Sequence, residues 1–155
     1  MIQRIQSVYF LLAIIAAALM FVFPLAEFFG DSNFILYVYK LDFFDPNPSL
    51  ELSPYFLLPL MGGVIMIAFL SLWALLSFKN RKRQLLITKI GMGFSLLLLA
   101  GYFFGYALML ERAVDNPPHY ELASFMPALI FLFLLLANKG VQKDEKLIKS
   151  MDRLR

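Results

Sequence analysis

The chain has 155 residues, of which 61% are hydrophobic and 16% are charged, and its formal net charge is +3. A soluble domain of this length cannot bury so much apolar surface, because soluble domains are typically about 45–50% apolar and about 25% charged. The composition therefore excludes an ordinary soluble enzyme, a disordered tail and a nucleic-acid-binding module, and it indicates a membrane protein. The chain has no cysteine, which excludes disulfides and thiolate metal sites.

Four uncharged stretches are long enough to cross a bilayer as helices. A helix needs about 20 apolar residues to cross a hydrocarbon core of about 30 Å, and the fourth stretch lies at the short end of the observed range. We predict spans at residues 5–26, 52–78, 90–110 and 122–138. The segments between them are then residues 27–51, 79–89 and 111–121, and a tail covers residues 139–155.

The basic residues predict the direction of these spans. Every lysine and arginine except Lys40 and Arg112 lies before the first span, between the second and third, or after the fourth. Cytoplasmic segments of membrane proteins carry an excess of lysine and arginine. We therefore expect both termini and residues 79–89 in the cytoplasm, with residues 27–51 and 111–121 on the outer side.

The densest basic cluster consists of Lys79, Arg81, Lys82 and Arg83. We interpret it as a topology anchor that contacts anionic lipid headgroups, where each cation contributes about 1 kcal/mol. Binding of one specific lipid, or of nucleic acid, is the less favoured alternative. The lipid bilayer is thus an expected partner, and nucleic acid is not.

The four predicted spans contain no Asp, Glu, Lys, Arg or His. Ionisable groups at membrane depth mark proton relays, ion paths and substrate counter-charges. A proton-coupled transporter, an ion channel or an intramembrane enzyme made by one copy of this chain is therefore not expected. We identify no catalytic residue, no metal ligand and no cofactor.

Small residues provide surfaces on which membrane helices can approach closely. Gly101 and Gly105 form a GxxxG motif in the third span, and Gly91 lies further along the same span, towards its predicted cytoplasmic end. Ala13 and Ala17 have the same four-residue spacing in the first span. These residues either pack the four spans against one another or form a docking face for another membrane subunit.

The outer segments contain prolines, β-forming residues and a few ionisable groups. Pro59 is expected to kink the second span. The prolines of these segments either open an outward-facing cleft or mark helix ends and loop turns, and the second interpretation is favoured. The β-forming residues predict a strand at about residues 34–41 that forms a hairpin with residues near Leu50. An enzyme would require four outer residues to converge, namely Glu27, Asp31, His119 and Glu121.

The tail has the pattern of an amphipathic helix. Its apolar positions recur at helical spacing and are flanked by lysines and arginines. They are Leu147, Ile148, Met151 and Leu154. Such a helix suits the membrane surface, and it equally suits a groove on a partner protein.

Distinctive segments lie at the two ends of the chain and in the link between the second and third spans. They are Met1 to Gln6, Ala137 to Lys139, Lys143 to Leu147 and Asp152 to Arg155, with Asn80 to Lys82 in the link. These segments resemble those of a bacterial inner-membrane family known as domain of unknown function 4293. The resemblance extends over essentially the whole chain. It implies four spans in a bacterial inner membrane, and it carries no functional residue over to this sequence.

These observations predict a single all-α domain, a four-helix transmembrane bundle with a short β-like outer loop and a cytosolic C-terminal amphipathic helix. The preferred function is a non-enzymatic accessory, scaffold or assembly subunit of a larger membrane complex, with other membrane-protein subunits as partners. The alternative is a protein that handles small solutes or lipids in an outward-facing cavity.

Overall fold

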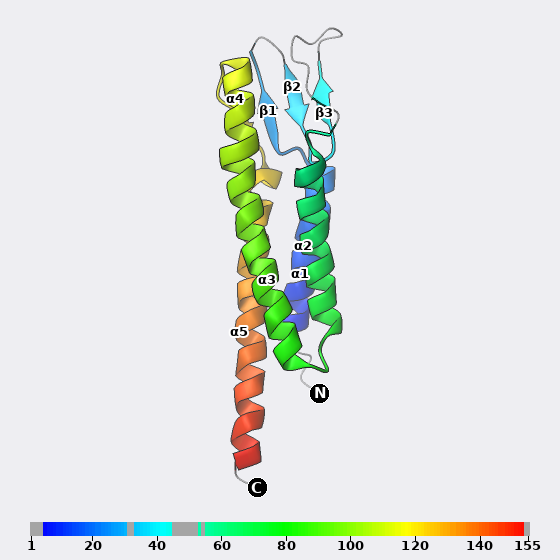
Figure 1. Ribbon diagram of the computed structural model, residues 1–155, viewed down its shortest axis with the longest axis vertical. Coiled ribbons are helices and arrows are strands. Elements are labelled where there is room, and N and C mark those ends of the chain that lie inside the picture. The colour runs from blue at the N-terminus through cyan, green and yellow to red at the C-terminus, as the bar shows by residue number, and fades with distance from the viewer. Residues whose placement is uncertain (1–4, 31–32, 45–52, 54, 154–155) are drawn as a thin grey trace.

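The computed structural model describes residues 5–30, 33–44, 53 and 55–153, with the side chains described as far as residue 146. Four long helical segments run side by side along the longest axis of the molecule, and a small sheet lies at the end opposite the two termini (Figure 1). The segments are α1 (Ile5–Val22), α2 (Leu58–Leu76), a third formed by α3 (Arg81–Ala100), η1 (Gly101–Ala107) and α4 (Leu108–Val114), and α5 (Met126–Arg153). All four are long and apolar enough to cross a membrane, which confirms the predicted number of spans.

Prolines explain where the first two helices end and begin. α1 stops at Val22, because a residue that precedes a proline disfavours helical backbone and Pro24 follows closely. α2 begins at Leu58, so Pro59 lies in its first turn, where the missing N–H of proline costs little. The predicted kink at Pro59 is therefore wrong.

The third helix begins earlier than expected. The side chain of Asn80 accepts a hydrogen bond of 3.1 Å from the backbone N–H of Arg83 and caps the helix. Residues 79–89 are therefore mostly helix and not a loop, because the basic side chains extend the helix beyond the apolar stretch. Near its outer end, the helix widens into the π-helical segment η1.

The fourth span and the tail form one helix. The 3-10 turn η2 (Leu122–Phe125) leads into α5, which continues without a break to Arg153. The predicted span at residues 122–138 and the predicted tail helix are therefore parts of one continuous helix. Neither glycine nor proline ends the helix here: Gly140 lies within it, and no proline follows Pro127.

The outer segments form a four-stranded antiparallel sheet in the order β3-β2-β1-β4. Its strands are β1 (Ala26–Phe28), β2 (Phe34–Leu36), β3 (Leu41–Phe43) and β4 (His119–Tyr120). The prediction of a strand at 34–41 is correct only for its first three residues. A turn follows them, in which the N–H of Tyr37 donates to the carbonyl of Lys40, so the hairpin partner is β3; Leu50 lies outside the described residues.

One apolar core extends through the bundle and under the sheet. α1 and α3 each pack against both α2 and α5. Many large apolar side chains, including Leu97, Phe104 and Ile65, face outward from the bundle. A monomer in water rarely exposes so much apolar surface, whereas lipid tails cover it without cost.

Candidate functional site

The tight turn between α2 and α3 carries the basic cluster of the chain. Ser77 ends α2, and its N–H donates to the carbonyls of Trp73 and Ala74. The N–H of Asn80 donates to the carbonyl of Ser77, and Asn80 then caps α3. Two successive capped helix ends therefore present the basic side chains at one corner of the bundle.

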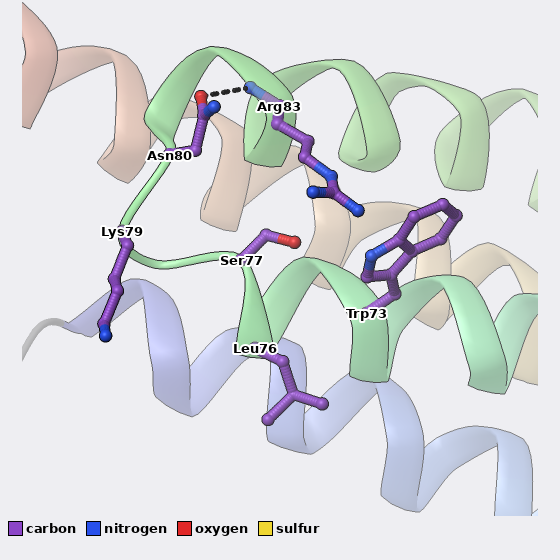
Figure 2. A pocket seen from close by; sticks show the side chains of 6 residues that line it. All are labelled: Trp73, Leu76, Ser77, Lys79, Asn80 and Arg83. Carbon is purple, nitrogen blue, oxygen red and sulfur yellow. Dashed lines mark hydrogen bonds between the residues drawn. The ribbon is translucent and has the colours of Figure 1, made fainter.

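A pocket of about 270 Å³ lies at this corner. Figure 2 shows that Arg83, Ser77 and Trp73 point toward the same space, whereas the side chains of Leu76 and Lys79 extend away from it. The Arg83 guanidinium lies 5.2 Å from the centre of the Trp73 ring, which is within the range of a cation–π interaction. The lining residues are Trp73, Leu76, Ser77, Lys79, Asn80 and Arg83.

The four cations predicted to contact lipid occupy different surroundings. Lys79 and Arg83 line the pocket, and Lys82 is exposed but does not line it. Arg81 turns to the opposite side and donates a hydrogen bond of 2.8 Å to the backbone carbonyl of Asp144 in α5. Lys40 is ion-paired with Asp42 beside the sheet, whereas no described carboxylate forms an ion pair with Arg83.

Sequence reasoning missed the role of Trp73 and Ser77 in this pocket. Both residues lie inside the predicted second span, where hydropathy assigns them no role beyond crossing the membrane. A usable signal was present, because tryptophan favours the membrane–water interface and Trp73 precedes the basic cluster by less than two helical turns.

Three of the predicted small residues lie in helix–helix contacts. Ala13 and Ala17 are buried in the core. Gly91 is buried as well, and a Cβ atom at this position would lie 3.2 Å from Cδ1 of Leu134 in α5. The small size of Gly91 therefore sets how closely α3 and α5 approach.

Gly101 and Gly105 are placed differently. Both are exposed, and a Cβ atom added to either would meet no described atom within 4 Å. The interpretation that this GxxxG motif packs the spans of one chain against each other is therefore wrong for the described residues. The two glycines lie in the π-helical segment, which directs Tyr102 and Tyr106 towards the other helices.

The tyrosines of η1 hydrogen-bond to other segments at the end of the bundle that carries the sheet. The hydroxyl of Tyr102 lies 2.9 Å from that of Ser124, and both hydroxyls bond the backbone carbonyl of Leu25. The hydroxyl of Tyr106 donates to the carbonyl of Phe56 at 3.0 Å. These polar groups are therefore engaged in joining helices and not in lining a water-filled path.

The apolar tail positions Leu147, Ile148 and Met151 belong to α5, while Leu154 lies outside the described residues. The backbone of α5 extends beyond the inner ends of the other three helices (Figure 1). It is thus a continuation of a span and does not fold back along the bundle.

The outer ionisable residues come together only in part. Antiparallel pairing places Glu27 of β1 opposite His119 of β4, and the His119 ring packs edge-on against Phe29. The N–H of Glu121 donates to the carbonyl of Leu25, and Asp31 lies outside the described residues. Within the ranges that the structure describes, no group of three His, Asp or Glu side chains could hold a metal ion.

Comparison with the curated proteins and with the solved structures finds no match. The family described as domain of unknown function (DUF4293) matches residues 2–154, nearly the whole chain. The resemblance in the terminal segments is therefore confirmed, and this four-helix protein belongs to the DUF4293 family.

Proposed function

We propose that this protein is a non-enzymatic accessory, scaffold or assembly subunit of a larger complex in the bacterial inner membrane, with both termini in the cytoplasm. The orientation is supported by the basic turn, which lies at the same end of the molecule as the two termini (Figure 1). The small sheet then lies on the outer side.

The observation that carries the proposal is the continuity of α5. Its 28 residues span about 42 Å at 1.5 Å per residue. If the helix leaves the hydrocarbon near Lys139, Leu147 is about 12 Å and Met151 about 18 Å further along its axis. The interfacial layer on each side of a bilayer is only about 5–8 Å thick, so the apolar stripe is held beyond the headgroups.

This geometry favours a protein partner over the membrane surface. An interfacial helix lies in the plane of the membrane and buries its apolar face among the headgroups, which an extension of a spanning helix cannot do. An apolar stripe in water is instead stabilised by a groove on another protein. The hydrogen bond from Arg81 to the backbone carbonyl of Asp144 supports a straight exit of α5 from the membrane, because it holds α5 against the turn between α2 and α3.

The alternative of a solute-handling or lipid-handling protein depended on an outward-facing cleft. Pro59 lies at the start of α2 and introduces no kink within it. Tyr102, Tyr106 and Ser124 hydrogen-bond to neighbouring segments at the outer end. No observation in the described residues therefore favours this alternative over a subunit role.

Blue-native electrophoresis after mild solubilisation tests the proposal. We expect the wild-type chain to migrate in an assembly that contains other proteins. Replacing Leu147 and Met151 together by serine should release the chain from the assembly. The matched control replaces Lys149 and Asp152 by serine, which leaves the net charge unchanged and alters only polar positions outside the apolar stripe; this variant should remain assembled. A wild-type chain that migrates only as a monomer or homo-oligomer would refute the proposal.

A further inference from the structure

We propose that the pocket between α2 and α3 binds the headgroup of one anionic glycerophospholipid, with its phosphate held by Arg83 and Ser77 beside the Trp73 ring. This inference goes beyond the proposed subunit role and does not depend on it. The orientation of the chain decides only which leaflet supplies the lipid.

The first argument is the state of the Arg83 side chain. Guanidinium groups bind phosphate through paired N–H donors, and arginine is preferred where such planar recognition is needed. The guanidinium lies over the Trp73 ring, and its N–H groups make no hydrogen bond to a described residue. No described carboxylate forms an ion pair with Arg83. The N–H groups of its guanidinium can therefore bind an anion from outside the chain.

The second argument is the pocket around that edge. Ser77 points into the same space as Arg83 (Figure 2), and a hydroxyl can donate a hydrogen bond to a phosphate oxygen. The start of α3 also borders the pocket at Asn80, and helix N-termini favour negative charge. Asn80 already satisfies the N–H of Arg83, so the helix end contributes its dipole to the pocket and not that N–H.

The third argument is the position of the pocket relative to the membrane surface, together with its volume. Trp73, a residue type that gathers at the membrane interface, forms one wall. Typical small-molecule sites enclose about 300–1,000 Å³, so a pocket of about 270 Å³ fits a headgroup better than a larger solute.

The fourth argument identifies the lipid as the source of the phosphate. Exposed apolar side chains continue from the pocket along both helices towards the middle of the bundle. They recur at helical spacing from Trp73 and Arg83, and they are Phe69 and Met66 on α2 and Ile90 and Phe94 on α3. Two acyl chains attached to a headgroup in the pocket would lie along these stripes, whereas a free phosphate ester would leave them unused.

Trp73 makes the test direct, because it is the only tryptophan in the chain. The purified full-length protein in detergent is titrated with a phosphatidylglycerol that carries brominated acyl chains, and quenching of Trp73 fluorescence is followed. We expect saturable quenching by this lipid and much weaker quenching by brominated phosphatidylcholine. Glycerol 3-phosphate should displace the brominated phosphatidylglycerol much less well than unbrominated phosphatidylglycerol does. If the two displaced it equally at the same concentration, the pocket would be a site for a soluble phosphate ester, and the lipid assignment would be overturned.

Neighbouring cations provide the matched variants. Arg83→Ala should raise the apparent Kd by about tenfold or more, the loss expected for a charge-assisted hydrogen-bonding group. Lys82→Ala removes the same charge one residue away and should change the Kd by less than about twofold. Arg83→Lys should give an intermediate Kd, and it keeps the test decisive if Arg83→Ala does not fold. Equal effects of the Arg83 and Lys82 substitutions would show that lipid binds the basic cluster without using the pocket.

Discussion

The Arg81 guanidinium donates a hydrogen bond of 2.8 Å to the backbone carbonyl of Asp144, 63 residues further along the chain. The bond joins the start of α3 to α5, and α5 continues beyond the ends of the other three helices (Figure 1). Because the acceptor is a backbone atom, the contact holds the helix itself and not one flexible side chain. Through this bond, a residue of the basic cluster holds the part of α5 that leads into the tail.

Removing this bond should loosen α5 where it leaves the bundle. Arg81→Ala deletes a charge-assisted hydrogen bond, so the amides of residues 139–146 should exchange with deuterium about three- to tenfold faster. Hydrogen exchange followed by mass spectrometry measures this. Lys82→Ala is the control, because it removes the same charge without a described contact to α5. Unchanged exchange in Arg81→Ala would mean that the bond does not stabilise the exit of α5.

Two glycines of α3 should respond in opposite ways to enlargement. Gly91→Leu forces a side chain against Leu134 and should lower the free energy of unfolding by about 1–3 kcal/mol. Gly93→Leu, two residues later, meets no described atom within 4 Å, and leucine has a higher helix propensity than glycine, so this variant should be neutral or stabilised. Thermal unfolding in detergent distinguishes them; equal destabilisation would contradict the packing of α3 against α5.

The hydroxyls of Tyr102 and Ser124 should be partly redundant as hydrogen-bond donors to the Leu25 carbonyl. Tyr102→Phe and Ser124→Ala should each cost about 1 kcal/mol, because either hydroxyl alone can still donate to the Leu25 carbonyl. The double variant should cost more than the sum of the two, because only the backbone N–H of Glu121 then donates to that carbonyl. Strict additivity of the three unfolding free energies would show that the two hydroxyls act independently.

The absence of cysteine makes the orientation easy to test. Lys82→Cys should react with a membrane-impermeant thiol reagent only after the cytoplasmic face is made accessible, because Lys82 lies in the basic turn. Lys40→Cys, on the outer sheet, should react in intact cells with a permeable outer membrane. The reverse pattern would invert the proposed topology.

The number and order of the helices could be predicted because membrane spans depend on local hydrophobicity. The first and last residues of the helices were less predictable, because they depend on capping side chains and prolines and not on hydropathy. Asn80 starts α3 within a charged segment that was expected to be a loop, and Pro24 ends α1 within an apolar segment that was expected to be helix. Hydropathy carries no information about either event.

The sheet and the pocket depended on contacts between distant segments. β1 pairs with β4, although two of the four long helical segments lie between Glu27 and His119 in the sequence. The pocket combines Trp73 of one predicted span with Arg83 of an expected loop. The basic cluster was visible as a set of charges, but only the tertiary structure separates Arg83, beside the tryptophan, from Arg81, bonded to α5.

The most direct test of the central claim, that α5 carries its apolar stripe to another protein, is photocrosslinking in living cells. A photoreactive amino acid replaces Met151, and a second variant carries it in place of Lys149 on the opposite face. The account predicts an adduct between the Met151 variant and a protein of different sequence, with a much lower yield from Lys149. Adducts only with lipid or with a second copy of the chain, or equal yields from both positions, would contradict it.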